Sequence, residues 1–383
     1  MLLFPGSILS RRPNNPAKAT STIQIDEASA GILPNNPFVE RDQNGEYLNF
    51  DILIKNTGTH TLYLATIEAT VMDASVKPVF RQAINVNSQG TGLKAIGNTT
   101  LKPGQTIDIF NPFYAYPPDV KITFLQYQFD FDYADLPKQR ENNKKRLSTD
   151  FDLSLKKIIT PKAYLPKNSY RLPLKGKLVV MDGRSFYPGQ SIGPAGVAEQ
   201  SVKGVALKSN RYAFDLGSAD DNGNLFKNDP FVKENWYAFG QAVYAPATGI
   251  VVDLQNTLPD NDFKGKSLKF AREASDADPN HLGNYVIIDQ GNGEFCMLQH
   301  LEQGSLLVRI GQLVHQGEQL GKIGFSGDIT FPHLHYRLMN NAKPLTADGI
   351  PGYFDNYKRY SGRSFTDLKR GRIESGDIVE TDR

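Results

Sequence analysis

The sequence predicts an all-β protein, and three observations lead to this fold class. The chain of 383 residues is rich in strand-favouring aromatic residues, with 17 Tyr and 22 Phe. It is also rich in turn-forming residues, with 23 Pro and 33 Gly. Apolar and polar residues alternate at 48–55 and again at 125–133, and a period of two buries one face of a strand. A chain of this length is expected to hold two or three domains.

The N-terminal part is expected to be an immunoglobulin-like β-sandwich at residues 21–135, after an extended segment at residues 1–20. Short alternating runs follow one another there, separated by turn residues such as Asn56-Thr57-Gly58. Seven or so short strands over about 100 residues are typical of this sandwich.

Residues 136–163 are expected to form a charged linker, because Lys and Arg are dense there among Asn and Ser. An open, antiparallel, barrel-like β domain is expected at residues 164–345. Within it, residues 256–282 are rich in Asp, Asn, Lys and Pro and predict a long loop. Residues 346–383 are expected to be a C-terminal extension.

The composition excludes several classes of protein. A formal net charge of +2 provides no basic field for nucleic acid. No run of apolar residues approaches the ~20 needed for a transmembrane helix. Cys296 is the one cysteine, so an intrachain disulfide is impossible. Residues 1–6 have no basic region and include Pro5, so they do not predict a signal peptide, although a trimmed one is compatible with the sequence.

Three of the six histidines lie in strand-like segments. His333 and His335 are two positions apart within 331–338, so on a strand their side chains point to one face. His300 ends another apolar run. Imidazoles on one face form half of a metal or acid–base site. Ordinary surface histidines are the alternative, but the concentration of three in such segments favours a site.

Residues 240–338 resemble the lysostaphin-type (LytM-type) zinc metallopeptidases, which cut peptidoglycan cross-links. The resemblance implies a bound zinc ion, and a peptidoglycan peptide or another Gly-rich peptide as the partner. It also implies a location in the cell envelope or outside the cell. The stretches that carry it are Ala245-Pro246-Ala247-Thr248-Gly249, 283–288, His300-Leu301, Gly304-Ser305, 317–324, Ser326-Gly327 and Pro332-His333-Leu334-His335.

The resemblance also assigns roles to residues. The family holds zinc with the His and Asp of an H-x-x-x-D motif and with the second His of H-x-H. Asp215 and His335 occupy the last two of these positions. His300 and His333 match the histidines that orient or polarise the attacking water. Zinc with three protein ligands keeps a fourth position for that water.

One position departs from the family pattern. The residue four before Asp215 is Arg211, and a guanidinium has no lone pair for a metal. Arg211 either pairs with Asp215 inside the site or points away from it. His281, at the end of the long loop, is an alternative third ligand.

Two functions follow from these residues. The first is a zinc endopeptidase that acts on peptidoglycan peptides. The second is a degenerate module that binds cell-wall peptide or a partner hydrolase without cleavage. The residues at the catalytic positions favour activity, and Arg211 favours its loss. A purely structural envelope protein is a third hypothesis. The presence of His300, His333, His335 and Asp215 together argues against it, because a structural domain does not need this set of residues.

Overall fold

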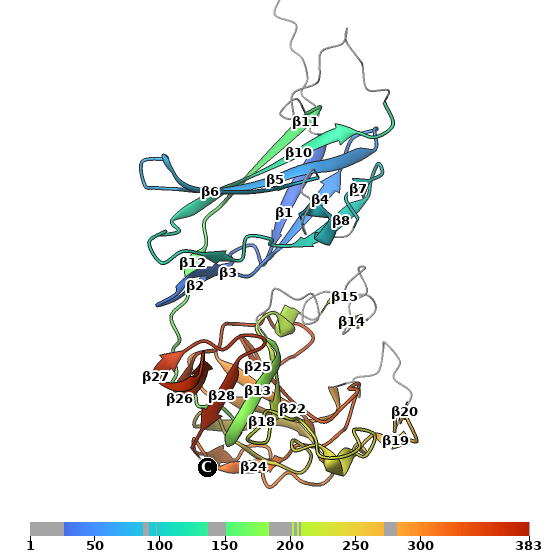
Figure 1. The fold of residues 1–383 in the computed structure, drawn as a ribbon, viewed down its shortest axis with the longest axis vertical. Helices are drawn as coiled ribbons and strands as arrows, with labels where there is room; N and C mark the ends of the chain where they lie inside the picture. Colours follow the sequence, from blue (N-terminus) through green and yellow to red (C-terminus); the bar gives the residue numbers. More distant parts are fainter. Residues whose placement is uncertain are drawn as a thin grey trace, which may run out of the picture.

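The computed structural model describes residues 27–86, 92–96, 98–136, 151–183, 201–202, 205–206, 208–271 and 282–382. The predicted all-β class is confirmed. Within these ranges helix is limited to short 3₁₀ turns such as η1 (Leu93–Ile96), η2 (Lys208–Asn210) and η3 (Lys233–Asn235). No helix among the described residues is long and apolar enough to span a bilayer. The strands form two bodies, β1–β12 and β13–β28 (Figure 1).

The N-terminal body is a sandwich of two antiparallel sheets. One has the order β1-β4-β8 and the other β11-β10-β5-β6, with β7 paired to β5. The alternation along β10 places Leu125, Tyr127 and Phe129 in the core between the sheets. The strands are β1 (Ala28–Leu33), β4 (Asp51–Asn56), β5 (Leu62–Met72), β6 (Pro78–Asn85), β7 (Thr100–Leu101), β8 (Thr106–Phe110), β10 (Phe124–Tyr133) and β11 (Leu153–Ile159).

A small third sheet lies at the end of the sandwich nearest the C-terminal body (Figure 1). Its order is β12-β2-β3-β9. The strands are β2 (Phe38–Asp42), β3 (Gly45–Leu48), β9 (Ala115–Tyr116) and β12 (Lys162–Ala163).

The end of the expected linker, residues 151–163, instead belongs to the sandwich. β11 pairs with β10 along its whole length, and β12 pairs with β2. In β11 the exposed residues alternate with partly buried ones, and they include Lys156 and Ile158. Lys156 therefore lies on the solvent face of an edge strand. Residues 137–150 lie outside the described ranges.

The C-terminal body is organised around a ten-stranded sheet of order β23-β18-β21-β22-β25-β16-β13-β28-β26-β27. Its core lies on one face and includes Leu298, Leu334 and Tyr336. The strands are β13 (Gly176–Gly183), β16 (Phe214–Ser218), β18 (Gly249–Gln255), β21 (Asn284–Asp289), β22 (Phe295–Leu301), β23 (Leu313–Val314), β25 (Leu334–Met339), β26 (Phe354–Ser361), β27 (Ser364–Gly371) and β28 (Ile378–Thr381).

Short two-stranded sheets complete this body. They pair β14 with β15, β17 with β24, and β19 with β20. Their bounds are β14 (Ser201–Val202), β15 (Val205–Ala206), β17 (Ala242–Tyr244), β19 (Asp262–Lys264), β20 (Ser267–Lys269) and β24 (Gln319–Lys322).

Residues 346–383 were expected as an extension, but three strands within them, β26, β27 and β28, belong to the ten-stranded sheet. β28 pairs with β13, and β26 pairs with both β28 and β27. Because β13 also pairs with β16, β28 lies only two strands from the strand that carries Asp215. The C-terminal strands are therefore integral to the domain that carries the candidate site.

Charged residues join the two bodies around Arg372, which is 1% exposed. The Arg372 guanidinium lies 3.4 Å from the centre of the Tyr47 ring and donates a hydrogen bond of 2.8 Å to Tyr114 Oη. It also lies 3.6 Å from the Glu40 carboxylate and 3.7 Å from that of Asp42. A buried cation with several partners of this kind favours one relative arrangement of the domains.

Candidate active site

The H-x-H motif begins just before a strand. β25 starts at Leu334, so that His333 directly precedes the strand and His335 lies within it. His333 is 6% exposed and His335 is 1% exposed. The core residues Leu334 and Tyr336 alternate with them and point to the opposite face. The period of two thus places both imidazoles on the face away from the main core.

Asp215 lies next to His335 because their strands pair in register. β16 and β25 are antiparallel, with Asp215 opposite His335. His335 Nδ1 donates a hydrogen bond of 2.7 Å to Asp215 Oδ1. His333 Nε2 lies 3.5 Å from the same oxygen. One carboxylate therefore faces both histidines of the H-x-H motif.

His300 reaches the same cluster through a β-bulge in β22. The register between β21 and β22 shifts between Asn284 and Tyr285, so that His300 is the extra residue opposite them. Its φ of +65° is a left-handed value, as in one class of β-bulge. Plain alternation would send His300 to the core face that holds Leu298. The bulge instead brings its ring to 5.3 Å from His333 and 5.8 Å from His335, centre to centre.

Ser326 holds the bulge in place. Its hydroxyl donates to Leu301 O at 2.8 Å and accepts from Asn284 N at 2.9 Å. Its carbonyl accepts a 2.9 Å hydrogen bond from His300 Nδ1. A Cβ on Gly283, whose φ is +67°, would lie 2.4 Å from that carbonyl oxygen. Roles for Ser326 and Gly283 were not predicted from the sequence, where the Ser-Gly step and the glycine before Asn284 are the available signals.

Hydrogen bonding fixes the same tautomer on all three histidines. The Nδ1 atoms of His300 and His333 face the carbonyl oxygens of Ser326 and Phe331, at 2.9 and 3.0 Å, and a carbonyl can only accept. His335 Nδ1 faces a carboxylate. In the neutral rings the lone pair is therefore on Nε2. The Nε2 atoms of His300 and His335 are buried without a hydrogen-bond partner, which costs about 1–3 kcal/mol each.

Burial and mutual charge set the protonation of the cluster. Burial lowers the pKa of His300 well below its ordinary value, and nearby His333 and His335 lower it further. Burial also lowers the pKa of His335, although Asp215 partly offsets it. Burial alone would raise the pKa of Asp215, but the interactions with His333 and His335 outweigh it and lower the pKa. Asp215 is therefore a carboxylate at neutral pH, and the imidazoles of His300 and His335 are neutral beside it.

Arg211 points away from this cluster and towards the N-terminal domain. Its guanidinium forms a buried ion pair with Asp51. It also donates a 3.3 Å hydrogen bond to Asn49 Oδ1, while Asn49 Nδ2 donates 3.1 Å back to the carbonyl of Arg211. Of the two expected orientations, the structure has the outward one. The side chain of Arg211 thus contributes to an interdomain contact.

The described residues fit a zinc site only in part. A carboxylate and an imidazole are ligand types that zinc takes, and Asp215 and His335 present both. Within the described ranges, however, no group of three His, Cys, Asp or Glu side chains is arranged to hold a metal ion. Asp215 and His335 are instead joined by a direct hydrogen bond of 2.7 Å. His281 lies outside the described residues.

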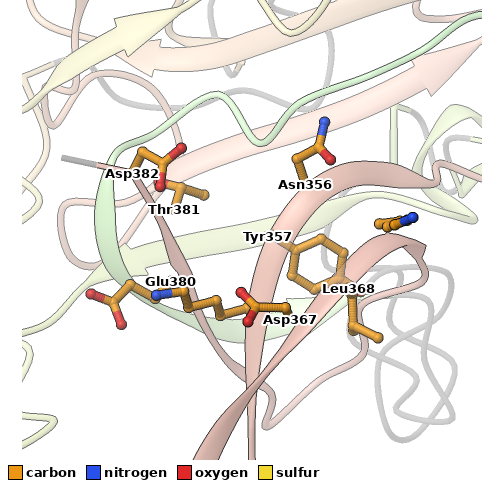
Figure 2. A pocket seen from close by; sticks show the side chains of 9 residues that line it. Asn356, Tyr357, Asp367, Leu368, Glu380, Thr381 and Asp382 are labelled. Carbon is orange, nitrogen blue, oxygen red and sulfur yellow. The ribbon is translucent and has the colours of Figure 1, made fainter.

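A separate open pocket of about 380 Å³ lies among β26, β27 and β28 (Figure 2). It is lined by both cationic and anionic side chains and by four uncharged residues, Asn356, Tyr357, Leu368 and Thr381. None of the four clustered residues lines it. The pocket therefore does not belong to the candidate site.

Comparison with known proteins places the histidines in a recognised domain. Residues 236–347 match Peptidase family M23. This range includes His300, His333 and His335, and Asp215 precedes it. In the structure β16, which carries Asp215, pairs directly with β25 of the matched range.

Curated relatives match over short stretches. The peptidoglycan DD-endopeptidase ShyA of Vibrio cholerae serotype O1 is 40% identical over 67 residues, which are 18% of this chain and 15% of that protein. ShyC of the same organism is 41% identical over 59 residues, or 15% of this chain and 13% of that protein. The chain thus spans about 15% of the length of the first of these relatives.

Solved structures match parts of this chain, with low TM-scores. The M23 metalloprotease pseudoalterin, described as from the deep sea, has 13% identity and a TM-score of 0.29, covering 53% of this chain and 92% of that one. A zinc-containing peptidase from Vibrio cholerae has 12% identity and a TM-score of 0.27, covering 76% of this chain and 77% of that one. The family match thus rests on the sequence, and residues 236–347 of this chain are a Peptidase family M23 domain.

Proposed function

We propose that the chain is a zinc-dependent endopeptidase that acts on the peptide cross-links of peptidoglycan. The observation that carries the proposal is the convergence of Asp215, His300, His333 and His335 from three adjacent strands inside an M23 domain. Two buried Nε2 atoms without partners call for a ligand there.

The residues divide into two roles. Asp215 and His335 are the proposed metal ligands, and zinc when bound would lower the pKa of a water molecule. His300 and His333, with Nε2 lone pairs and Nδ1 fixed to carbonyls, are the proposed groups that accept and return a proton.

His281 is the proposed third ligand. The next residue, Leu282, accepts a 3.2 Å hydrogen bond at its carbonyl from Gln299 Nε2. Gln299 lies opposite His335 in the register of β22 and β25. The chain therefore passes close to the cluster one residue after His281, which is the support for this assignment.

The substrate and location follow from the same proposal. A peptidoglycan peptide, or another Gly-rich peptide, would bind beside the histidines, and the site of action would be the cell envelope or the space outside it. The relatives named as peptidoglycan DD-endopeptidases support this substrate class.

The second candidate function is a non-hydrolytic module that binds cell-wall peptide or a partner hydrolase. The diversion of Arg211 to Asp51 favours it, since the family's first ligand is missing. The absence of a metal-holding trio among the described side chains favours it as well. The two candidates differ in whether the protein binds zinc.

Metal analysis of protein purified without a histidine tag separates them. The proposal predicts one zinc per chain in wild type and its loss in Asp215→Ala, His335→Ala and His281→Ala. The variants His300→Ala and His333→Ala should keep zinc while hydrolysis falls about 10²–10⁴-fold. Wild-type protein that takes up no zinc would support the binding module instead.

A further inference from the structure

An unbroken row of aromatic rings leads from the surface of the domain to the histidine cluster. Its members come from the loop after β16, the segment before β25, β25 itself and β22. Successive ring centres are 5.1, 5.2, 5.0, 5.3 and 5.8 Å apart. The rings, in order, are Phe226, Trp236, Phe331, His333, His300 and His335.

The outer rings are fixed by contacts outside the row. Trp236 Nε1 donates a 2.9 Å hydrogen bond to Pro230 O. Its backbone forms an isolated antiparallel bridge with Phe226. The Trp236 ring stacks on Phe331 with an angle of 16° between their planes. Trp236 is therefore a fixed wall against which Phe331 packs.

Phe331 contacts His333 in two ways. Its ring packs against the imidazole, and its carbonyl accepts the hydrogen bond from His333 Nδ1 at 3.0 Å. The ring contact limits how far the imidazole can rotate, and the carbonyl selects its tautomer. Displacing Phe331 would disturb both at once.

We propose that Trp236 is a positioning residue, which acts through Phe331 to hold the orientation and tautomer of His333. Both neighbours of Trp236 in the row are aromatic rings, so the indole supports the row from within. The catalytic consequence rests on the proposed hydrolysis, whereas the effect on the His333 ring does not.

The test uses the full chain labelled with ¹⁵N-histidine. Two-bond ¹H–¹⁵N correlation spectra distinguish the two neutral tautomers, and His333→Gln assigns the signal. Wild type should show His333 protonated on Nδ1. In Trp236→Met, which keeps apolar volume but has no ring, His333 should show both tautomers. Trp236→Phe should restore the wild-type spectrum, because a ring returns to the stack.

Phe231→Leu is the matched control. It lies in the same loop and loses a ring contact with Phe263 that is outside the row. His333 should be unchanged in this variant. If Trp236→Met fails to fold, Phe331→Leu, which removes the next ring, replaces it. An unchanged His333 signal in the folded variant, or equal shifts in all three histidines, would overturn the proposal.

Kinetics provide the second measurement. If the wild type hydrolyses peptide, kcat of Trp236→Met should fall about 10- to 100-fold, as for a small misplacement of a reacting group, with KM little changed. A rise in KM with unchanged kcat would assign Trp236 to substrate binding and overturn the positioning role. A wild type without hydrolysis defeats the proposed function but leaves the tautomer result valid.

Discussion

Arg211 belongs to the contact between the two bodies and does not face the candidate site. It lies four positions before Asp215, where the family pattern has a zinc ligand, yet it is 6% exposed and pairs with Asp51, which is 2% exposed. The sequence could show the substitution but not the new partner, because Asp51 is 160 residues away in the chain. Only the packing of the two domains brings them together.

Arg211→His is therefore expected to destabilise the protein without adding zinc. The Asp51 carboxylate would stay buried without its cation, which costs about 3–5 kcal/mol. Urea denaturation and metal analysis check the two parts. Adding Asp51→Asn should recover much of the stability. A rise in zinc content in Arg211→His alone would contradict the outward placement of this side chain.

Cys296 is expected to be inert to thiol reagents in the folded protein. It is fully buried, and burial raises the pKa of its thiol to about 12. The reactive thiolate would then be about 10⁻⁴ of the total at pH 8. A chromogenic disulfide reagent should detect no thiol at pH 8 in buffer and one per chain in guanidinium chloride. Rapid reaction in buffer would show that β22 opens readily.

At the scale of elements, the alternation at 125–133 was the clearest guide, because β10 buries Leu125, Tyr127 and Phe129 and leaves the residues between them partly exposed. The run at 48–55 is divided between β3 and β4, and β25 is buried on both faces, so that period two gave the facing of His333 and His335 but not their burial. The bulge at His300 was not predictable, because an inserted residue depends on the register with β21. β11 was taken for linker because Lys156 and Lys157 continue the charged run before it, although only Lys156 lies on the exposed face of the strand.

Gly283→Ala tests the element that shapes the site. Gly283 and Gly291 both have left-handed φ, at +67° and +75°, so either alanine costs about 1–3 kcal/mol of backbone strain. Only at Gly283 would the Cβ also meet Ser326, so that variant should lose about 1–3 kcal/mol more. Thermal or urea unfolding compares them. Equal losses would mean that the Gly283–Ser326 approach does not constrain the bulge.

At the scale of the whole molecule, the two bodies share buried charged contacts through Arg372 and Arg211. The division into two domains near residues 136–163 remains a prediction. The strand pairing of β10 with β11, however, crosses the expected boundary. A cut between these strands would leave β10 in one fragment and its pairing partner β11 in the other.

A chain with a specific protease site inserted at residues 137–150 tests this arrangement. After cleavage, two fragments should appear on a denaturing gel while gel filtration shows one particle of the original size. The β10–β11 ladder and the interdomain contacts should hold them together. The same cut made in urea should separate the fragments. Separation in native buffer would contradict the pairing.

Digestion of purified peptidoglycan tests the proposed function most directly. Tag-free wild-type protein with zinc should convert cross-linked muropeptides into uncross-linked ones, separated by liquid chromatography. His333→Ala and Asp215→Ala should leave the profile unchanged over the same period, because the proton-transferring group or the metal ligand is gone. An unchanged profile with wild type, or equal digestion by all three proteins, would contradict hydrolysis at Asp215, His300, His333 and His335.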